Sequence, residues 1–295
     1  MKRTLAIAAV LGFLAPAAAH GAEEREPLVL EATSDWVLDY ADQRCTLVRA
    51  FGEGSNEVRL RIDSFGSWTS FRFTAIGKRL PGSHGPTGDL VVRFTPDAEG
   101  RDTGALRGKS DGIEAAAFST TLAPIGLDDA GRPADSVQRW LEDPAIIAFE
   151  RQTDSLLLSF SRRTRILLRL GRMSGPLKAM RACVDDLHTS WGFDPAIQKL
   201  LRQRARPTEQ TVRSVQQDYP ASMLVNGMSA YVPVRVKVDT LGRPSDCVVQ
   251  SDVVDDAFRR AVCAGLSRQF EPAIDEMGRP IDSLYQTAVV YLLRS

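Results

Sequence analysis

The strict alternation of residues 231–239 constrains the fold of this chain more than any other segment. Mostly polar residues separate four valines that recur at every second position: Val232, Val234, Val236 and Val238. Because successive side chains of a strand point to opposite faces, this pattern predicts a strand with one buried face. Residues 240–243 are a turn signal, and residues 247–251 are suited to a return strand. The segment therefore predicts a β-hairpin.

The residues after this hairpin predict one helix and one long strand. Asp255 and Asp256 supply negative charge at the helix start, where it suits the helix dipole. The apolar residues that follow share one helical face: Phe258, Ala261, Val262, Gly265 and Leu266. Phe-Glu-Pro-Ala at 270–273 ends this helix, a turn follows at 277–280, and residues 281–293 complete the unit as a last strand.

In order and residue choice, these pieces resemble the C-terminal domain of TonB-type energy transducers. That family shows a Tyr-Pro pair, a valine-rich hairpin ending in Asp-x-x-Gly-Arg, an amphipathic helix, Phe-x-Pro-Ala and Gly-x-Pro. This chain has them in the same order, at Tyr219-Pro220 and at residues 234–243, 258–266, 270–273 and 278–280. Each piece alone is weak, but five in order are specific. The resemblance covers residues 215–295.

The resemblance implies a small antiparallel sheet that binds the N-terminal "box" of an outer-membrane receptor by strand addition. The family's fuller pattern is Gln-Pro-x-Tyr-Pro; this chain keeps the glutamine and has Gln217 in place of the first proline. Carried over by position, the expected partner-binding residues are Gln216, Tyr219, Pro220, Tyr285, Thr287, Val289 and Tyr291. Ordinary packing accounts for the same side chains equally well.

Edge pairing gives this expectation a physical basis. An edge strand leaves N–H and C=O groups unpaired, and an extended peptide or a second copy of the chain can bond to them. The edge is expected at residues 283–291, with the N–H of Thr287 as one of its free donors. A homodimer through the same edge is the alternative.

The N-terminus predicts export. Residues 1–3 (Met-Lys-Arg) are basic, residues 5–19 are largely apolar, and residues 17–19 (Ala-Ala-Ala) offer a cleavage site. The apolar run is shorter than the roughly 20 residues of a membrane-spanning helix. Residues 1–22 are therefore expected to be a cleaved signal peptide of a periplasmic protein, with an inner-membrane anchor as the alternative.

The remaining chain is expected to be α+β with two domains. Residues 27–195 carry many short alternating runs separated by Gly/Pro turns, which favour a β-rich domain, either a sandwich or an open barrel. A short helix is expected at 137–141, and a second helix from Ser174 through Cys183 and Leu187, with Ser174 as its cap and Pro176 in its first turn. Residues 196–214 are basic and polar and are expected to be a linker. No family is identified for residues 27–195.

The four cysteines are expected to form two disulfides in an oxidising compartment. From the domain positions we expect Cys247–Cys263 inside the C-terminal unit and Cys45–Cys183 in the N-terminal domain. Metal or redox chemistry is the weaker alternative, because there is no Cys-x-x-Cys motif and His84 and His188 are the only histidines after the signal.

No motif predicts catalysis, so the chain is not expected to be an enzyme, to hold a cofactor or to bind a metal. Asp102-Thr103-Gly104-Ala105 matches the aspartic-protease tetrapeptide, but its neighbours are polar. Asp185 and His188 share a helix face, but two residues do not make a site. Lysine plus arginine and aspartate plus glutamate number 37 each, which gives no field that favours nucleic acid.

The sequence therefore favours a binding module for an outer-membrane receptor or another envelope protein, associated with TonB-dependent transport. A structural protein that self-associates, or a hydrolase with its site in the N-terminal domain, are the alternatives. A folded β domain stands where an energy transducer has its proline-rich spacer, so force transmission by this chain is not expected.

Overall fold

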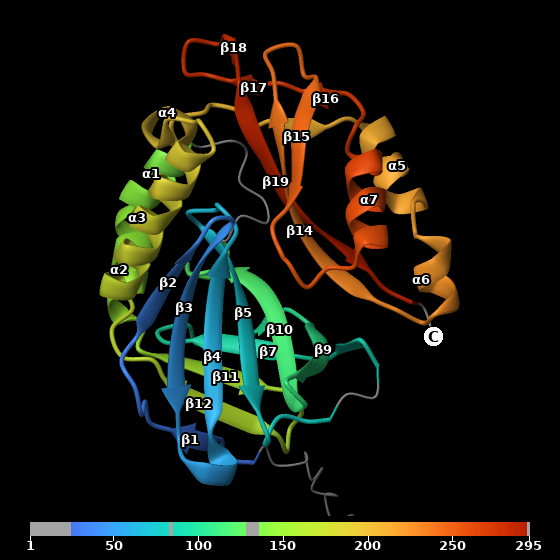
Figure 1. Ribbon diagram of the computed structural model, residues 1–295. Coiled ribbons are helices and arrows are strands. Elements are labelled where there is room, and N and C mark those ends of the chain that lie inside the picture. Colours follow the sequence, from blue (N-terminus) through green and yellow to red (C-terminus); the bar gives the residue numbers. More distant parts are fainter. Residues whose placement is uncertain (1–24, 83–84, 128–135, 294–295) are drawn as a thin grey trace, which may run out of the picture.

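The computed structural model describes residues 25–82, 85–127 and 136–293. Over these residues the protein is mixed α+β, as expected, with several mainly antiparallel sheets and no closed barrel (Figure 1). The expected signal peptide at 1–22 and His84 lie outside the described residues. None of the described helices is long and apolar enough to cross a membrane.

Two sheets build the N-terminal domain. The seven-stranded sheet has the order β2 (Val37–Ala41), β3 (Arg44–Phe51), β4 (Val58–Ser64), β5 (Ser70–Gly77), β10 (Ile113–Thr121), β9 (Ala105–Ser110) and β6 (Thr87–Gly88). The five-stranded sheet has the order β1 (Leu28–Leu30), β12 (Arg165–Arg169), β11 (Ser155–Ser159), β7 (Val91–Phe94) and β8 (Arg101–Asp102). A 3₁₀ turn, η1 (Gly54–Asn56), precedes β4.

The two sheets share one hydrophobic core. Alternate residues of β4 and β5 point into it, and Phe73 lies 5.1 Å from Phe118 and 5.6 Å from Phe94 of the other sheet, between ring centroids. The intervening residues of the seven-stranded sheet form its outer face, which is polar and includes Arg59, Asp63 and Arg72. Period-two alternation therefore gives this sheet one buried and one polar face.

Three helices flank this core, α1 (Val137–Glu142), α2 (Pro144–Gln152) and α3 (Ser174–Ser190). The helix expected at 137–141 is confirmed, whereas α2 was not predicted. Helix α3 begins at Ser174 as expected, but the capping position is Met173, so Ser174 is the first helical residue and not the cap. The Cys45–Cys183 disulfide joins β3 to α3.

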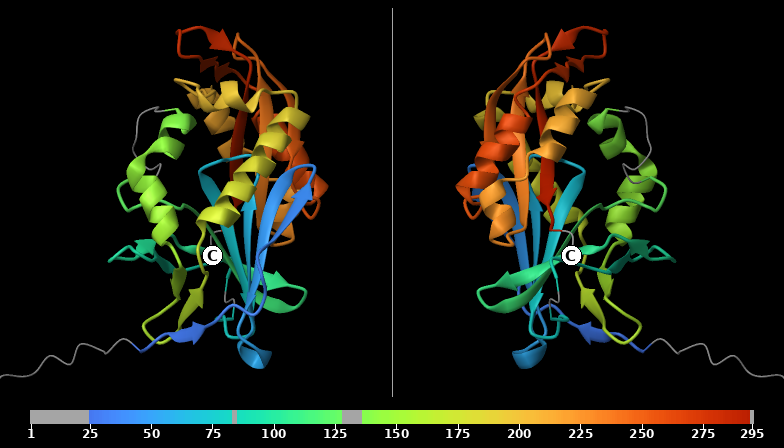
Figure 2. Two further views of the ribbon diagram at one scale, coloured as in Figure 1. Left: turned by 90° about the vertical axis from the view of Figure 1, so that its left-hand side faces the viewer. Right: turned by 90° about the vertical axis from the view of Figure 1, so that its right-hand side faces the viewer.

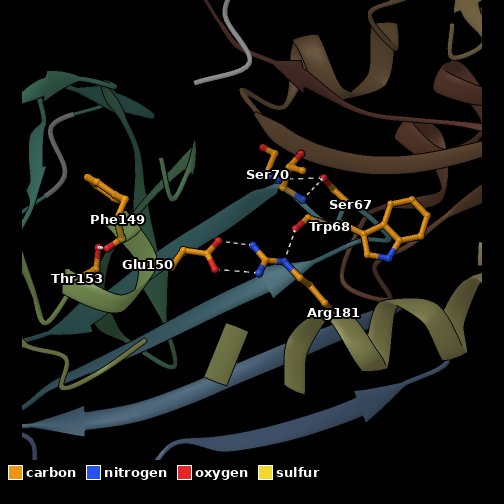
Figure 3. Close-up of polar contacts among 8 residues, drawn as sticks. Ser67, Trp68, Ser70, Phe149, Glu150, Thr153 and Arg181 are labelled. Atoms are coloured by element: carbon orange, nitrogen blue, oxygen red, sulfur yellow. Dashed lines mark hydrogen bonds and ion pairs between the residues drawn. The ribbon is translucent and has the colours of Figure 1, made fainter. Parts of the chain in front are cut away.

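A buried ion pair ties α2 to α3. Arg181 of α3 donates two hydrogen bonds to the Glu150 carboxylate, and its Nε donates to the Trp68 carbonyl at 3.2 Å (Figure 3). Glu150 is 7% exposed, so the pair fixes the two helices in a region that excludes water. Removing one partner would leave a buried charge unpaired, which is strongly destabilising.

The C-terminal domain consists of a three-stranded sheet under helices. Its elements are α6 (Ala221–Val225), β14 (Ala230–Val238), β15 (Pro244–Val249), α7 (Asp256–Gly265), β16 (Phe270–Glu271), β17 (Ala273–Ile274), β18 (Pro280–Ile281) and β19 (Ser283–Tyr291). The sheet order is β15-β14-β19. All four alternating valines of β14 are at most 1% exposed, and α7 covers them through Phe258 and Val262. The Cys247–Cys263 disulfide joins β15 to α7, so both cysteine pairs are those expected from the sequence.

Residues 196–214, expected as a linker, are instead folded parts of the molecule. They include most of α4 (Pro195–Lys199), β13 (Arg206–Pro207) and the start of α5 (Glu209–Gln217). Leu201 and Ala205 belong to the second core, and β13 pairs with β16. A few apolar residues at the right spacing are enough to dock a segment whose overall composition is polar.

Two copies of one turn close the hairpins of this domain. In the first, the Asp239 carboxylate accepts hydrogen bonds from the N–H groups of Leu241 and Arg243, both at 2.8 Å, and from the Arg243 side chain. Asp275 does the same for Met277 and Arg279. These hydrogen bonds lower the pKa of both carboxyl groups. The turns are therefore most stable at a pH where both carboxylates are ionised, and they lose this stabilisation on acidification.

The remaining face of the three-stranded sheet packs on the N-terminal domain (Figures 1 and 2). The Gln250 amide donates to the carbonyls of Gln43 and Phe65 at 3.1 and 2.9 Å, and the Gln286 amide donates to the same Phe65 carbonyl at 3.1 Å. Arg235 lies over Trp191, 4.8 Å from the ring centroid. Side chains of both domains therefore fix their relative position.

His188 predicts how stability depends on pH. It is 2% exposed, its Nε2 lies 2.9 Å from the Gly66 carbonyl, and its Nδ1 has no partner in the described residues. Burial lowers the pKa of His188 to about 4, so between about pH 6.5 and 4 the unfolded chain binds the extra proton. The free energy of unfolding should therefore fall on acidification, by about 3 kcal/mol from this residue alone.

The measurement is urea unfolding of the wild type and of His188→Gln between pH 7 and pH 4. The glutamine retains a donor for Gly66 but does not titrate, so the variant should lose less stability over this range. Equal pH dependence in the two proteins would contradict the assignment.

Candidate functional site

Strand β19 lies at the end of its sheet. It pairs with β14 over nine residues, from Ala230↔Tyr291 to Val238↔Ser283. In the part of the chain that the structure describes, no strand pairs with its other edge. The edge strand expected at 283–291 is therefore present at those residues.

One hydrogen bond determines which main-chain groups of β19 face outward. The N–H of Gln250 donates to the Pro233 carbonyl at 2.8 Å, so Pro233 directs its main chain toward β15. Because main-chain groups alternate in direction along a strand, Val232, Val234 and Val236 direct theirs toward β19. Their partners in β19 are Val289, Thr287 and Tyr285, which therefore point back to β14. The outward groups of β19 are those of Gln286, Ala288 and Val290.

This direction corrects the expectation for Thr287. Its N–H and C=O belong to the ladder with β14 and are not free donors and acceptors at the edge. The side-chain pattern could not reveal this, because it depends on which strand lies on which side of β14. The free row instead centres on Ala288, which the sequence analysis did not single out.

A groove runs between β19 and helix α5. It has a volume of about 650 Å³, and we call it the α5 groove. Six of the seven predicted partner-binding residues line it: Gln216, Tyr219, Tyr285, Thr287, Val289 and Tyr291. The opposite wall includes Val212 and Val215 of α5. Pro220 does not line the groove; its carbonyl accepts the first hydrogen bonds of α6, from Met223 and Leu224.

Several of these residues also form part of the core. Tyr219 makes edge-to-face contacts with Phe258 and Tyr291, and its hydroxyl donates to the Met228 carbonyl. Tyr291 is 4% exposed, its hydroxyl has no partner in the described residues, and burial raises its pKa to about 12. Burial also raises the pKa of Tyr285. The aromatic residues thus shape the groove by packing beneath it.

Gly265 fixes the distance between α5 and α7. A Cβ added at this position would lie 2.9 Å from both Cα and Cγ2 of Val215 on α5. The two helices can approach this closely because residue 265 has no side chain. The width of the α5 groove therefore depends on this glycine.

A second cavity lies on the other side of the same edge, between the two domains. This interdomain pocket has a volume of about 310 Å³, and its walls include Asp63, Arg72 and Ser119 of one domain and Tyr231, Gln250 and Gln286 of the other. Thr287 and Ala288 line both it and the α5 groove. The Gln250 side chain is 1% exposed, and its Oε1 has no hydrogen-bond partner in the described residues.

Sequence reasoning missed the interdomain pocket. The second face of β14 carries Tyr231 and Arg235, and these large side chains indicated that the face is covered by protein. The residues that cover it come from far earlier in the chain. Arg72 stacks on Tyr231, with its guanidinium carbon 3.5 Å from the ring centroid. Nothing local in residues 70–77 indicates this contact.

A larger cavity than the α5 groove does not compete as the candidate site. Its volume is about 730 Å³, and it lies near α4 and the β17–β18 hairpin. Its lining contains no predicted site residue, and its charged Asp275 and Arg279 are paired with each other in the hairpin turn. The α5 groove is smaller but includes a free strand edge.

The polar clusters of the N-terminal domain have structural partners. Asp185 accepts hydrogen bonds from Trp68 and from Lys199, both at 2.7 Å, while His188 contacts Gly66. Asp185 and His188 therefore do not form an acid–base pair with each other. The described residues contain no group of three or more His, Cys, Asp or Glu that could hold a metal ion.

Gly265→Ala should push α5 away from α7. Overpacking of this kind lowers the free energy of unfolding by about 1–3 kcal/mol. Gly175→Ala is the matched control, because an added Cβ in that helix meets nothing within 4 Å. The control should be neutral or gain up to about 1 kcal/mol from helix propensity. Urea unfolding of both variants tests this, and equal stabilities would contradict the close approach.

Comparison with models of known protein families gives no match, and comparison with curated protein sequences gives none either. The function is therefore inferred from the residues and geometry of the chain itself.

Proposed function

We propose that this chain is a periplasmic binding protein whose C-terminal domain takes up an extended segment of another envelope protein by strand addition to β19. An outer-membrane receptor of TonB-dependent transport is the partner that the resemblance of residues 215–295 favours. The observation that carries the proposal is the unpaired edge of β19, whose outward groups lie on Gln286, Ala288 and Val290.

The surroundings of this edge suit a strand better than a compact ligand. Cavities lie on both sides of Ala288, the α5 groove on one and the interdomain pocket on the other. Side chains of an added strand alternate between the two faces of the extended sheet. Each cavity would therefore receive every second side chain, while main-chain hydrogen bonds supply affinity.

Two features support an exported protein. Both disulfides, Cys45–Cys183 and Cys247–Cys263, are of the kind that persists in oxidising compartments. The first 22 residues have the basic start, apolar run and small-residue site of a signal peptide.

Self-association through the same edge is the second candidate. Val290 is 43% exposed and Leu292 is 38% exposed at its end, and exposed apolar side chains on an unpaired edge favour pairing with another strand. A dimer would occupy the edge that the partner needs.

Proline scanning along β19 tests strand addition. Ala288→Pro removes an outward N–H and obstructs pairing, so it should weaken peptide binding at least about tenfold while the domain stays folded. Ala288→Ser keeps the N–H and should bind like the wild type. Thr287→Pro removes an N–H that bonds to β14 and should destabilise the domain itself.

Binding would be measured by fluorescence anisotropy with synthetic peptides from the N-terminal segments of outer-membrane receptors, and folding by circular dichroism. A folded Ala288→Pro protein with unchanged binding would exclude strand addition at this edge. A concentration-dependent dimer that Ala288→Pro abolishes would favour the second candidate.

A further inference from the structure

We infer that the N-terminal domain is part of the peptide site and that it selects a strand with acidic side chains on the face it contacts. This inference rests on the proposed strand addition and specifies its partner. It starts from the position of the β19 edge, which lies above the polar outer face of the seven-stranded sheet.

Arg72 is the central residue of this face. It lies in β5, opposite Asp63 of β4, and lines the interdomain pocket. Its guanidinium stacks on Tyr231 and forms no ion pair with any described residue. The Asp63 carboxylate directs its hydrogen bonds elsewhere, to Thr46 at 2.7 Å and to Arg61 at 3.0 Å. The Asp63 carboxylate acts on Arg72 only at longer range, so this positive charge in a partly desolvated pocket has no close ion-pair partner among the described residues.

The positive character continues along the edge. A third cavity of about 380 Å³, which we call the basic pocket, contains Arg72, Arg107 and Lys109. No aspartate or glutamate is among the described residues that line it, and of its three cations Lys109 is paired with Glu114 at 3.5 Å. Val290 and Leu292 line both the basic pocket and the α5 groove. In the same way, Ala288 lines both the interdomain pocket and the α5 groove. Two cavities that carry cations thus follow one side of the edge.

The other side of the edge has a different character. There the α5 groove presents Val212, Val215 and Leu266. A strand paired with Gln286, Ala288 and Val290 would send alternate side chains to the α5 groove and to the cationic pockets. The fitting partner is an extended segment of a second protein in which apolar and acidic residues alternate. Charge complementarity of this kind fixes register and suppresses wrong partners.

The test uses the full mature chain and three peptides of the length of β19, nine residues. In each peptide valine alternates with glutamate, glutamine or lysine. The glutamate peptide should bind on the order of tenfold more tightly than the glutamine peptide, and the lysine peptide most weakly. Added salt should reduce the difference.

Variants assign the preference to Arg72. Arg72→Gln should abolish the preference for glutamate over glutamine, and Arg72→Lys should retain it. Arg59→Gln is the matched control, because Arg59 lies on the same sheet face but lines none of the three cavities. It should leave the preference unchanged. Circular dichroism of each variant verifies the fold.

The outcomes separate the two proposals. Suppose that Ala288→Pro abolishes peptide binding but the wild type shows no preference for glutamate, or the preference survives in Arg72→Gln. Either result would overturn this inference, and strand addition would remain supported. Failure of all three peptides and of the receptor peptides to bind would overturn both. If a dimer of this chain excludes the peptides, the strand added to β19 comes from a second copy, and the inference of a different partner protein is overturned.

Discussion

The burial of four alternating valines of β14 beneath α7 decides where every other part of the C-terminal domain lies. Because these valines take one face of the strand, Tyr231, Pro233 and Arg235 must take the other. One strand therefore supplies a hydrophobic floor for its own domain and a polar surface for the neighbouring one. Both edges of β14 are also paired, one with β15 and the other with β19. Among the described strands, the open edges of the sheet are thereby the outer edges of β15 and β19.

The position of the β19 edge brings the N-terminal domain to the candidate site, which the fold of that domain alone does not suggest. Its seven-stranded sheet has a complete core on one face. On the opposite face Arg72 contacts Tyr231 of the C-terminal domain, so a surface residue of one domain lines the pocket between the two domains. On the opposite wall, Gly265 allows α5 to lie close to α7.

The sequence predicted those features that local patterns determine. Period-two valines predicted β14, the aspartates at 255 and 256 predicted the start of α7, and domain position predicted both cysteine pairs. Apart from α2, whose Asp143-Pro144 start is a local signal, the failures have one cause, which is contact between distant residues. Residues 196–214 look polar, but Leu201 and Ala205 fill the second core. The direction of the Thr287 main chain depends on β15, and Arg72 gains its role only when a strand more than 150 residues later packs over it. No pattern within either segment encodes such pairings.

The carbonyl of Phe65 has a further consequence. It accepts hydrogen bonds from the amides of Gln250 and Gln286, which carry no charge. Salt screens interactions between exposed charges but leaves neutral hydrogen bonds largely unaffected. These two hydrogen bonds between the domains therefore depend little on ionic strength, whereas the attraction between Arg72 and a charged segment decreases as salt is added. A change in ionic strength would then alter how strongly the pockets around Arg72 attract a charged segment, while the hydrogen bonds at Phe65 stay in place.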